Sequence, residues 1–368
     1  MPAVLVVGGA GAFGGRLAEG LIRTSDFAVV IAGRDLARAE ARAAALGSRA
    51  RAMRIDSATV AAEALRESGA FAVVDAAGPF QGAQYRLARA ALAAGMHYVD
   101  LADARDFVVG FGALDPEARA AGRVALSGAS STPALSHAVL ERLIRGWRRL
   151  DSVEIAISPG NRNAPRGLSV VQAILSYAGR PVRVFVDGAW TERPGWGRPR
   201  RTEMPGLGKR WLSLCETPDL DLVPARYAPR DAAIFHAGLE LPVMHLGLYA
   251  ASLLVQARLL RSLCPFAGMF RWIAERLKGF GSDRGGMMVV AAGIDSEGRP
   301  IRAVWSLIAE SGAGPIIPTL PALAAIRAIA EGQITQPGAR PCVGVLGLDT
   351  IEREFAPYAI TTEIATRR

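Results

Sequence analysis

The sequence predicts an α/β protein in which a doubly wound parallel sheet is followed by a second, α+β domain. β-branched runs alternate with helical patterns over residues 1–145, as parallel strands joined by helices require. A glycine-rich turn follows the first of these runs. Beyond Leu150 the alternation gives way to pairs of extended runs joined by short turns, which are typical of antiparallel hairpins. A chain of 368 residues is long enough for two domains.

The composition is that of a globular protein, with 51% hydrophobic and 21% charged residues. The net charge is +9, but the arginines are scattered through helical patterns without interleaved aromatic residues, so no nucleic-acid partner is expected. The three cysteines and four histidines show neither disulfide nor metal-ligand spacing, so no metal is expected. Unpaired cysteines favour a reducing compartment, and glycines interrupt the apolar start of the sequence; we therefore expect a cytoplasmic protein without a signal peptide.

The first strand-to-helix unit carries a dinucleotide-binding pattern. Residues 3–7 read AVLVV, a run expected of a central strand that is buried on both faces. Gly9, Gly11 and Gly14 then form GxGxxG ahead of a helical pattern, which is the context that this motif requires. Gly9 permits the tight turn, Gly11 lets the backbone approach a pyrophosphate, and Gly14 lets the helix pack on its strand. The alternative is a structural glycine turn in another kind of α/β protein.

The second unit indicates which nicotinamide dinucleotide is bound. A strand over 28–32 is followed by Arg34, at the place where an acidic residue would bind the ribose 2′-hydroxyl of NAD. A guanidinium suits a 2′-phosphate, so NADP is expected in preference to NAD. The alternative is a solvated arginine at a strand end. The third strand ends at Asp56, which together with Ser57 lies beside the adenine or caps the helix that follows.

Three more strands complete the first domain. A strand over 71–75 leads into a small-residue turn with Pro79, and the next strand has Tyr98 and Asp100 near its carboxyl end. The sixth strand runs into a Ser/Thr-rich turn and a long helix. This alternation predicts a Rossmann domain that binds its ligands at the carboxyl ends of the strands.

Four motifs in this region resemble the NADP-binding domain of the saccharopine dehydrogenase family, in particular its saccharopine dehydrogenase-like oxidoreductases. They are VVGGAGAFGG, VVDAAGPFQG, AALAAGMHYVDLADARDF and ALSGASSTPALSHAV, in order within residues 1–145. The resemblance implies a Rossmann domain followed by an α+β domain for the substrate and often for dimer contacts. It also implies redox chemistry at carbon–nitrogen bonds of amino acids.

The resemblance also assigns site residues. The pyrophosphate would be cradled by Gly9, Gly11, Ala12, Phe13 and Gly14. Arg34 would meet the 2′-phosphate. The nicotinamide ribose would be lined by Ala77, Gly78, Pro79 and Phe80, with Tyr98 and Asp100 nearby. One departure concerns the turn after the sixth strand, where the saccharopine-forming reductases have an acidic residue and this sequence reads SSTP over 130–133.

The pattern over residues 146–312 predicts the α+β domain. SVEIAI is a strand, Asp187-Gly188 joins the strands of one hairpin, and a second hairpin turns at 295–298. The loop SPGNRNAPRG carries four polar or basic residues, Asn161, Arg162, Asn163 and Arg166. Because arginine forks match carboxylates, this loop either clamps a substrate carboxylate or is simply solvated.

The remaining segment, residues 313–368, contains a helix that starts at proline. One face of this helix carries Ala322, Ala325, Ile326 and Ile329. By the resemblance, the segment returns to pack against the Rossmann domain, which makes the first domain discontinuous.

An apolar stretch covers residues 241–260, but His245, Gln256 and Arg258 interrupt it, which argues against a membrane-spanning helix. Buried helices between domains or at a homodimer interface fit the stretch better. The alternative is a pair of helices that lies on a membrane surface and continues through residue 278. His245 is expected to be a satisfied core histidine rather than a catalyst.

These observations predict an NADP-dependent oxidoreductase that moves a hydride to or from a small amino-acid or imine-type substrate. Reduction of an imine also needs a proton donor. The candidates are Asp100, Tyr98, Ser131, Tyr177 and His236. The alternative function is that of a catalytically silent NADP-binding scaffold, in the cytoplasm or peripheral to a membrane.

Overall fold

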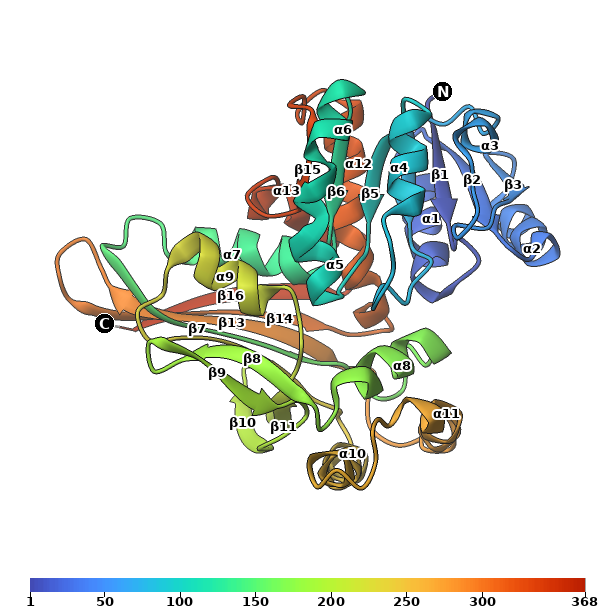
Figure 1. Ribbon diagram of the computed structural model, residues 1–368. Coiled ribbons are helices and arrows are strands. Elements are labelled where there is room, and N and C mark those ends of the chain that lie inside the picture. The colour runs from blue at the N-terminus through green and yellow to red at the C-terminus, as the bar shows by residue number, and fades with distance from the viewer. Residues whose placement is uncertain (368) are drawn as a thin grey trace. The chain divides into compact units, whose positions relative to one another are not determined.

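The computed structural model describes residues 1–367, which form two compact units (Figure 1). Unit 1 comprises Met1–Leu135 and Ile316–Glu354, and unit 2 comprises Ser136–Pro315 and the chain from Phe355 onward. The first boundary lies ten residues before the position expected from the sequence. The reason is that α7 (Ser136–Leu143) packs against strands β13 and β14 of unit 2.

Unit 1 is built on a seven-stranded sheet in which every pair of neighbours is parallel. The strand order is β15-β6-β5-β4-β1-β2-β3. The strands are β1 (Ala3–Val7), β2 (Ala28–Gly33), β3 (Ala50–Arg54), β4 (Ala72–Asp75), β5 (His97–Asp100), β6 (Val124–Ser127) and β15 (Gly338–Pro341). Apolar residues fill β1 and β4 because these central strands are covered on both faces. The order reverses between β1 and β4, which is where doubly wound sheets bind ligands.

The helices of unit 1 cross between successive strands. The main ones are α1 (Ala12–Thr24), α2 (Leu36–Leu46), α3 (Ala62–Arg66), α4 (Arg86–Ala93), α5 (Arg105–Val109) and α6 (Asp115–Ala120). Helix α1 contacts α2 and the returning α12 (Leu320–Ala330), whereas α4 contacts α3 and α6. These two groups of helices cover the two faces of the sheet, as the doubly wound prediction requires.

The carboxyl-terminal segment adds one strand and several helical turns to unit 1. Strand β15 extends the sheet beside β6, with Ala339 opposite Ala125. Helix α12 packs against α1 and β5, and α13 (Leu348–Glu352) packs against α12. The sequence predicts one apolar face for α12, but nine of its residues are buried and the helix is enclosed nearly all round.

The sequence predicts that residues 313–368 pack on the Rossmann domain as one segment, and the end of the chain departs from this. Strand β16 (Ile360–Arg367) pairs antiparallel with β14 in unit 2, with Ile364 opposite Trp305. The chain therefore belongs to unit 1 only as far as Glu354. The tail is held by main-chain hydrogen bonds to the ten-residue strand β14. Its mostly polar sequence gives no local signal for this pairing.

Unit 2 contains a mixed nine-stranded sheet with a main path β10-β11-β12-β7-β13-β14-β16. Its strands, besides β16, are β7 (Arg149–Ser158), β8 (Pro181–Val186), β9 (Ala189–Pro194), β10 (Arg200–Met204), β11 (Gly208–Leu214), β12 (Ala232–Ala237), β13 (Gly285–Ile294) and β14 (Pro300–Ala309). Both predicted hairpins are present, β8–β9 around Asp187-Gly188 and β13–β14 around residues 295–299. The second domain is therefore α+β, as the sequence predicts.

The other helices of unit 2 are α8 (Leu168–Tyr177), α9 (Asp219–Tyr227), α10 (Pro242–Gln256) and α11 (Ala267–Arg276), with a short 3-10 turn η3 (Cys264–Phe266). Helix α9 packs on β8 and β12, and α7 packs on β13 and β14 (Figure 1). The apolar stretch 241–260 forms α10, which ends at Gln256. No helix in the described chain is both long and apolar enough to cross a membrane.

Candidate functional site

Glycine residues close the turn between β1 and α1 at the carboxyl edge of the unit 1 sheet. Gly8 has a φ of +78°, in the left-handed region that favours glycine. Its N–H donates to the carbonyl of Ala32 at 2.8 Å, and a Cβ on Gly8 would lie 2.8 Å from the backbone of Ala76. The turn is therefore wedged between the ends of β2 and β4. The left-handed residue is Gly8, one position before Gly9, to which the motif assigns the turn.

The three motif glycines are required by close approach rather than by a left-handed backbone. A Cβ on Gly9 would lie 2.8 Å from the carbonyl oxygen of Val6. A Cβ on Gly14 would lie 2.3 Å from the carbonyl oxygen of Gly8, so helix α1 rests directly on the turn. A Cβ on Gly11 would lie 3.0 Å from the same oxygen. Side chains at these positions would fill the space beside the turn.

The amino end of α1 presents free amides at this turn. The first hydrogen bond of the helix runs from the N–H of Gly15 to the carbonyl of Gly11 at 3.0 Å. The N–H groups of Ala12, Phe13 and Gly14 precede it and have no partner inside the helix. Within the described chain no side chain caps this end and no acidic residue lies in the first turn. Gly11 and Ala12 are exposed, so a diphosphate fits against these amides and the helix dipole.

Two arginines follow β2, Arg34 directly after the strand and Arg38 in the first turn of α2. Arg34 is exposed and has no hydrogen bond or ion pair with any other residue of 1–367. Asp35 accepts a hydrogen bond from the N–H of Arg38 at 3.1 Å, so this carboxylate caps α2. The guanidinium of Arg38 reaches the carbonyl of Ala10 in the glycine turn, Nη2 to O 3.5 Å. Arg38 is not among the residues expected from the sequence; the signal for it is its place one helical turn after Arg34.

Asp56 and Ser57 follow β3 on the same edge of the sheet. The N–H of Ile55 donates to the carbonyl of Gly33 at 3.0 Å, which places Asp56 beside the Arg34 segment. Asp56 accepts a hydrogen bond from the N–H of Ala58 at 3.0 Å. Helix α3 starts only at Ala62, so Asp56 caps a turn and not the helix. Asp56 is exposed and Ser57 is half-buried.

The loop after β4 contains the residues that the resemblance assigns to the nicotinamide ribose. Ala77 and Pro79 are exposed, and Gly78 is half-buried. Phe80 turns inward, where its ring packs against Phe107 at a centroid distance of 5.3 Å. The loop therefore keeps a small-residue surface outside and is anchored by one aromatic ring inside.

Two buried carboxyls and a tyrosine meet at the ends of β4 and β5. Asp75 and Asp100 are partners in the parallel register, and Tyr98 donates from its hydroxyl to Asp75 Oδ2 at 3.4 Å. Asp100 Oδ1 accepts from the N–H of Ala102, from Ser127 Oγ and from the N–H of Gly128 at 3.0, 3.0 and 2.7 Å. Asp100 Oδ2 is buried without a hydrogen-bond partner in residues 1–367. The sequence placed Asp75 at a strand end but not in the site.

Burial controls the protonation of this cluster. Burial raises the pKa of Asp75 to about 6 and that of Asp100 to about 7, and each carboxyl is held acidic in part by the hydrogen bonds it accepts. Burial and the two neighbouring carboxyls raise the pKa of Tyr98 well above its usual value. The two carboxyls interact, so their protons come off as a coupled pair near neutral pH. Such a pair can hold or release a proton at physiological pH.

A cysteine from the returning segment joins this neighbourhood. The N–H of Cys342, directly after β15, donates to the carbonyl of Ser127 at 2.7 Å. Burial, with Asp100 nearby, raises the pKa of the Cys342 thiol to about 12. The thiol is therefore protonated at neutral pH and adds bulk rather than a nucleophile. Nothing in the sequence around Cys342 predicts that it lies near β5 and β6.

The other proposed proton donors have different surroundings. Ser131 follows β6 in unit 1 and is half-buried. Tyr177 and His236 lie in unit 2: the Tyr177 hydroxyl contacts Cys215 Sγ at 3.0 Å, and His236 Nδ1 lies 3.2 Å from Arg200 Nη2. Burial, with Arg200 adding to it, lowers the pKa of His236 to about 3. His236 is neutral at physiological pH, which makes it a poor acid.

His245 and the polar loop of unit 2 serve the structure. His245 Nδ1 accepts from the N–H of Leu239 at 3.3 Å and Nε2 lies 3.0 Å from Ser213 Oγ, so both ring nitrogens are satisfied in the core as predicted. Asn161 and Arg166 donate to main-chain carbonyls in residues 274–280. These two side chains hold the end of α11 and the chain after it, so they are engaged within the protein and are not free to clamp a carboxylate. Residues 1–367 contain no group of three or more side chains that could hold a metal ion.

Known proteins resemble this chain in the sequence of its first domain and in its fold. Residues 4–140 match the family model of the saccharopine dehydrogenase NADP-binding domain. Apo saccharopine dehydrogenase (L-Glu forming) from Saccharomyces cerevisiae is similar over 100% of both chains, with a TM-score of 0.70 and 16% identity. A meso-dapdh mutant with DAP from Clostridium tetani E88 covers 97% of this chain and 99% of its own, with a TM-score of 0.49 and 12% identity. No curated protein matches the sequence.

The family model and the structural likeness confirm the resemblance that the four motifs indicate. The match over residues 4–140 covers all six strand-to-helix units and thus the glycine turn, Arg34 and the Asp75 cluster. The likeness to the yeast enzyme extends the same fold to the whole chain.

Proposed function

We propose that this chain, whose residues 4–140 form a saccharopine dehydrogenase NADP-binding domain, is an NADP(H)-dependent oxidoreductase acting on a small amino-acid or imine-type substrate. The observation that carries the proposal is the bare turn between β1 and α1. There a Cβ on Gly8, Gly9 or Gly14 would collide with the backbone, a Cβ on Gly11 would be crowded, and no side chain caps the first amides of α1.

The chain's own residues account for the binding of the dinucleotide. The amides of Ala12, Phe13 and Gly14 take the pyrophosphate. The exposed loop from Ala77 to Pro79 takes the nicotinamide ribose next to the switch point of the sheet. When bound, the nicotinamide supplies or accepts the hydride, and the protein contributes position and charge.

The preference for NADP over NAD rests on charge at the end of β2. Arg34 has no partner in the described residues and Arg38 reaches the glycine turn, so two guanidiniums are available for a 2′-phosphate. The neighbouring carboxylate of Asp35 is engaged as the cap of α2.

Proton transfer is assigned to the Asp75 and Asp100 pair. An imine that is reduced to an amine needs a proton as well as a hydride. The two carboxyls have raised pKa values and stand at the carboxyl edge where the nicotinamide loop begins. Asp75 is the more accessible of the two and directly precedes that loop, so we assign it the donor role; burial favours its protonated form, and the Tyr98 hydroxyl donates to the carboxylate that is left after the transfer.

The carbon–nitrogen substrate class is supported by the motifs and by the fold that the chain shares with the yeast enzyme. The Ser-Ser-Thr-Pro turn over 130–133 lacks a carboxylate, so the buried pair at the ends of β4 and β5 replaces it as the source of the proton.

The test is a titration of the purified chain with NADPH and NADH, followed by oxidation of NADPH in the presence of oxo acids with and without amines. We expect NADPH to bind more tightly and its oxidation to need both substrate components. Failure to bind either dinucleotide would overturn the proposal. Tight NADPH binding without oxidation over the whole panel would favour the silent scaffold instead.

A further inference from the structure

Unit 2 exposes an unusual concentration of large apolar side chains. Nine of the fifteen large apolar side chains that are exposed in the described chain lie between Val243 and Phe280. Apart from Met1, every such side chain exposed by more than half lies in this segment, with Leu259 at 72% and Trp272 at 59%. Isolated exposed apolar residues need no explanation, but such a gathering marks an interaction surface. We call residues 241–280 the apolar hairpin.

Helix α11 carries one outward apolar stripe. Met269, Trp272 and Ile273 are exposed at spacing i, i+3 and i+4, and Arg276 follows at i+7. The guanidinium of Arg276 lies 5.2 Å from the centre of the Trp272 ring. The opposite side of α11 packs against α8. The helix is thus anchored by one apolar side while a second apolar side faces solvent.

Helix α10 repeats this arrangement without any charge. Its inward side buries His245, Leu248, Ser252 and Val255. Its outward side carries Val243, Gly247, Ala250 and Leu254, at spacing i, i+4, i+7 and i+11, and all four are exposed. Fifteen residues without Asp, Glu, Lys or Arg are unusual on a solvent-facing helix.

The charges around these stripes are almost all positive. The hairpin contains five basic residues and one acidic residue, Glu275. The five basic residues are exposed, and none has a hydrogen bond or ion pair from its side chain within residues 1–367; they are Arg258, Arg261, Arg271, Arg276 and Lys278. The surface therefore complements an anionic partner that also offers apolar contact.

Polar contacts hold the two ends of the hairpin in place. Glu240, just before α10, accepts from Ser282 N–H at 2.9 Å and Ser282 Oγ at 2.7 Å. Asn161 donates from Nδ2 to the carbonyls of Leu277 and Phe280 at 2.7 and 2.8 Å. Figure 1 shows α10 and α11 beyond the strands of unit 2, away from the turn between β13 and β14. The apolar stripes are thus presented by a fixed element.

We propose that the apolar hairpin docks unit 2 on the surface of an anionic phospholipid bilayer. Trp272, Met269 and Val243 would enter the boundary between headgroups and acyl chains while the five exposed cations meet lipid phosphates. Neither helix is long enough to span a bilayer. A second copy of the chain is a poorer occupant because a two-fold interface would bring together ten cations and only two carboxylates from the two hairpins. This docking is independent of the proposed oxidoreductase function.

The test is co-sedimentation of the full chain with phosphatidylcholine vesicles, with and without phosphatidylglycerol. We expect binding to the anionic vesicles only, weakened at least about tenfold by raising salt from about 0.1 M to 0.5 M. Trp272→Ala should lower the bound fraction about tenfold. The double variant Arg271→Gln/Lys278→Gln should do the same while sparing the apolar stripe.

Trp190 provides a matched control. It is also an exposed tryptophan of unit 2 under a guanidinium, with Arg183 lying 4.4 Å from its ring centre. Trp190→Ala should leave vesicle binding unchanged, because β9 lies outside the hairpin. Unchanged thermal unfolding and far-ultraviolet dichroism would show that each variant is folded.

Three results would overturn docking on lipid. One is the absence of sedimentation with anionic vesicles. Another is equal binding by the wild type, Trp272→Ala and Trp190→Ala. The third is a dimer in sedimentation equilibrium that Trp272→Ala dissociates, which would assign the hairpin to self-association.

Discussion

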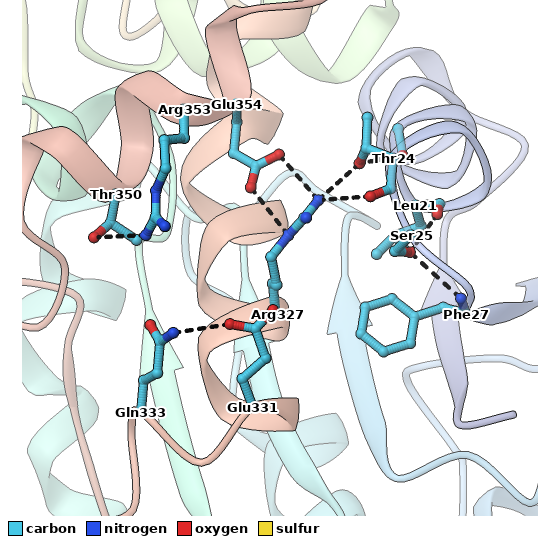
Figure 2. Close-up of polar contacts among 11 residues, drawn as sticks. Leu21, Thr24, Ser25, Phe27, Arg327, Glu331, Gln333, Thr350, Arg353 and Glu354 are labelled. Atoms are coloured by element: carbon cyan, nitrogen blue, oxygen red, sulfur yellow. Dashed lines mark hydrogen bonds and ion pairs between the residues drawn. The ribbon is translucent and has the colours of Figure 1, made fainter.

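Arg327 and Glu354 form a two-point ion pair in unit 1, with Nε 3.2 Å from Oε1 and Nη2 3.3 Å from Oε2 (Figure 2). The same Nη2 donates to the carbonyl and the hydroxyl of Thr24, each at 3.0 Å. One guanidinium from α12 thus joins the last turn of α1 to the final turn of the returning segment. The cation also lies at the carboxyl end of α1, where it opposes the negative end of the helix dipole.

The first prediction concerns this pair. Arg327→Met should lower the free energy of unfolding by about 1–3 kcal/mol, because it leaves the buried Glu354 carboxylate without its cation. Burial already raises the pKa of Glu354, and Arg327 opposes that rise. The loss should therefore shrink in acid, where Glu354 is protonated and needs no partner. Chemical denaturation of the variant at neutral and acidic pH measures this, and an equal loss at both would contradict it.

The second prediction concerns the glycine turn. Gly14→Ala should reduce NADPH affinity at least about tenfold and lower stability by about 1–3 kcal/mol, because its Cβ collides with the carbonyl of Gly8. Gly247 is a matched control, since it is also helical but a Cβ there would meet nothing within 4 Å. Gly247→Ala should keep NADPH binding and stabilise by up to about 1 kcal/mol. Fluorescence titration and thermal unfolding measure both quantities; tight NADPH binding by Gly14→Ala would refute this account of the turn.

The third prediction concerns the choice of dinucleotide. Arg34→Ala and Arg38→Ala should each weaken NADPH binding by about tenfold to a hundredfold, since a charged hydrogen bond to phosphate contributes about 1.5–3 kcal/mol. NADH binding should change little, and Arg34→Asp should shift the preference toward NADH. Arg201→Ala, at an exposed arginine of β10 in unit 2, is the control. Parallel losses for both dinucleotides would show that these arginines do not read the 2′-phosphate.

The fourth prediction is a pH dependence of stability from the buried carboxyls. The pKa values of about 6 for Asp75 and about 7 for Asp100 lie above the value of about 3.9 for an unfolded Asp. The folded chain therefore holds protons that the unfolded chain releases. The stability from these carboxyls is fully present below about pH 4 and is lost as the pH rises through 6 and 7, at up to about 1.4 kcal/mol per pH unit for each.

Asp75→Asn and Asp100→Asn should both flatten this decline, which calorimetry from pH 4 to 8 can follow. Asp219 in unit 2 is a control, because burial raises its pKa to about 7 as well. Asp219→Asn should reduce the decline of stability with pH by the contribution of Asp219 alone, and it should leave NADPH oxidation unaffected. A decline that is equally steep in the wild type and all three variants would disprove the assignment.

The fifth prediction concerns the proton donor. Asp75→Asn should lower kcat by about a hundredfold to ten-thousandfold while NADPH still binds, because an amide keeps the shape but cannot donate an acidic proton. Asp100→Asn should displace the alkaline limb of the kcat profile, where the donor loses its proton, since it removes the charge coupled to Asp75. Steady-state kinetics against pH distinguishes the two. Unaltered kcat in Asp75→Asn would remove this residue from the proposed chemistry.

Local features were predictable where neighbours in space are also neighbours in sequence. The glycine turn, the position of Arg34 and the two hairpins follow from residues within a few positions of one another. His245 was predictable as a core residue because it interrupts an apolar helix. Arg38 was also within reach, but its contact with Ala10 depends on how α2 lies against the turn.

Contacts between distant segments were not predictable in this way. Asp75 and Asp100 come together only because β4 and β5 are neighbours in register. Cys342 reaches Ser127 through β15, and the final strand joins unit 2 instead of unit 1. In each case the partner depends on the order of strands in the sheet and on which strand edge is left unpaired. The local pattern of polar and apolar residues contains no information about either.

The order of residues alone predicts the parallel α/β domain, its glycine turn, the cation after the second strand and the resemblance to the NADP-binding domain, since periodicity and backbone space are encoded locally. Folding in three dimensions adds the pairing of two carboxyls with raised pKa values, the enclosure of α12 and the outward apolar stripes of the hairpin. Protonation and exposure depend on what packs around a group, and that is settled by elements far away in the chain.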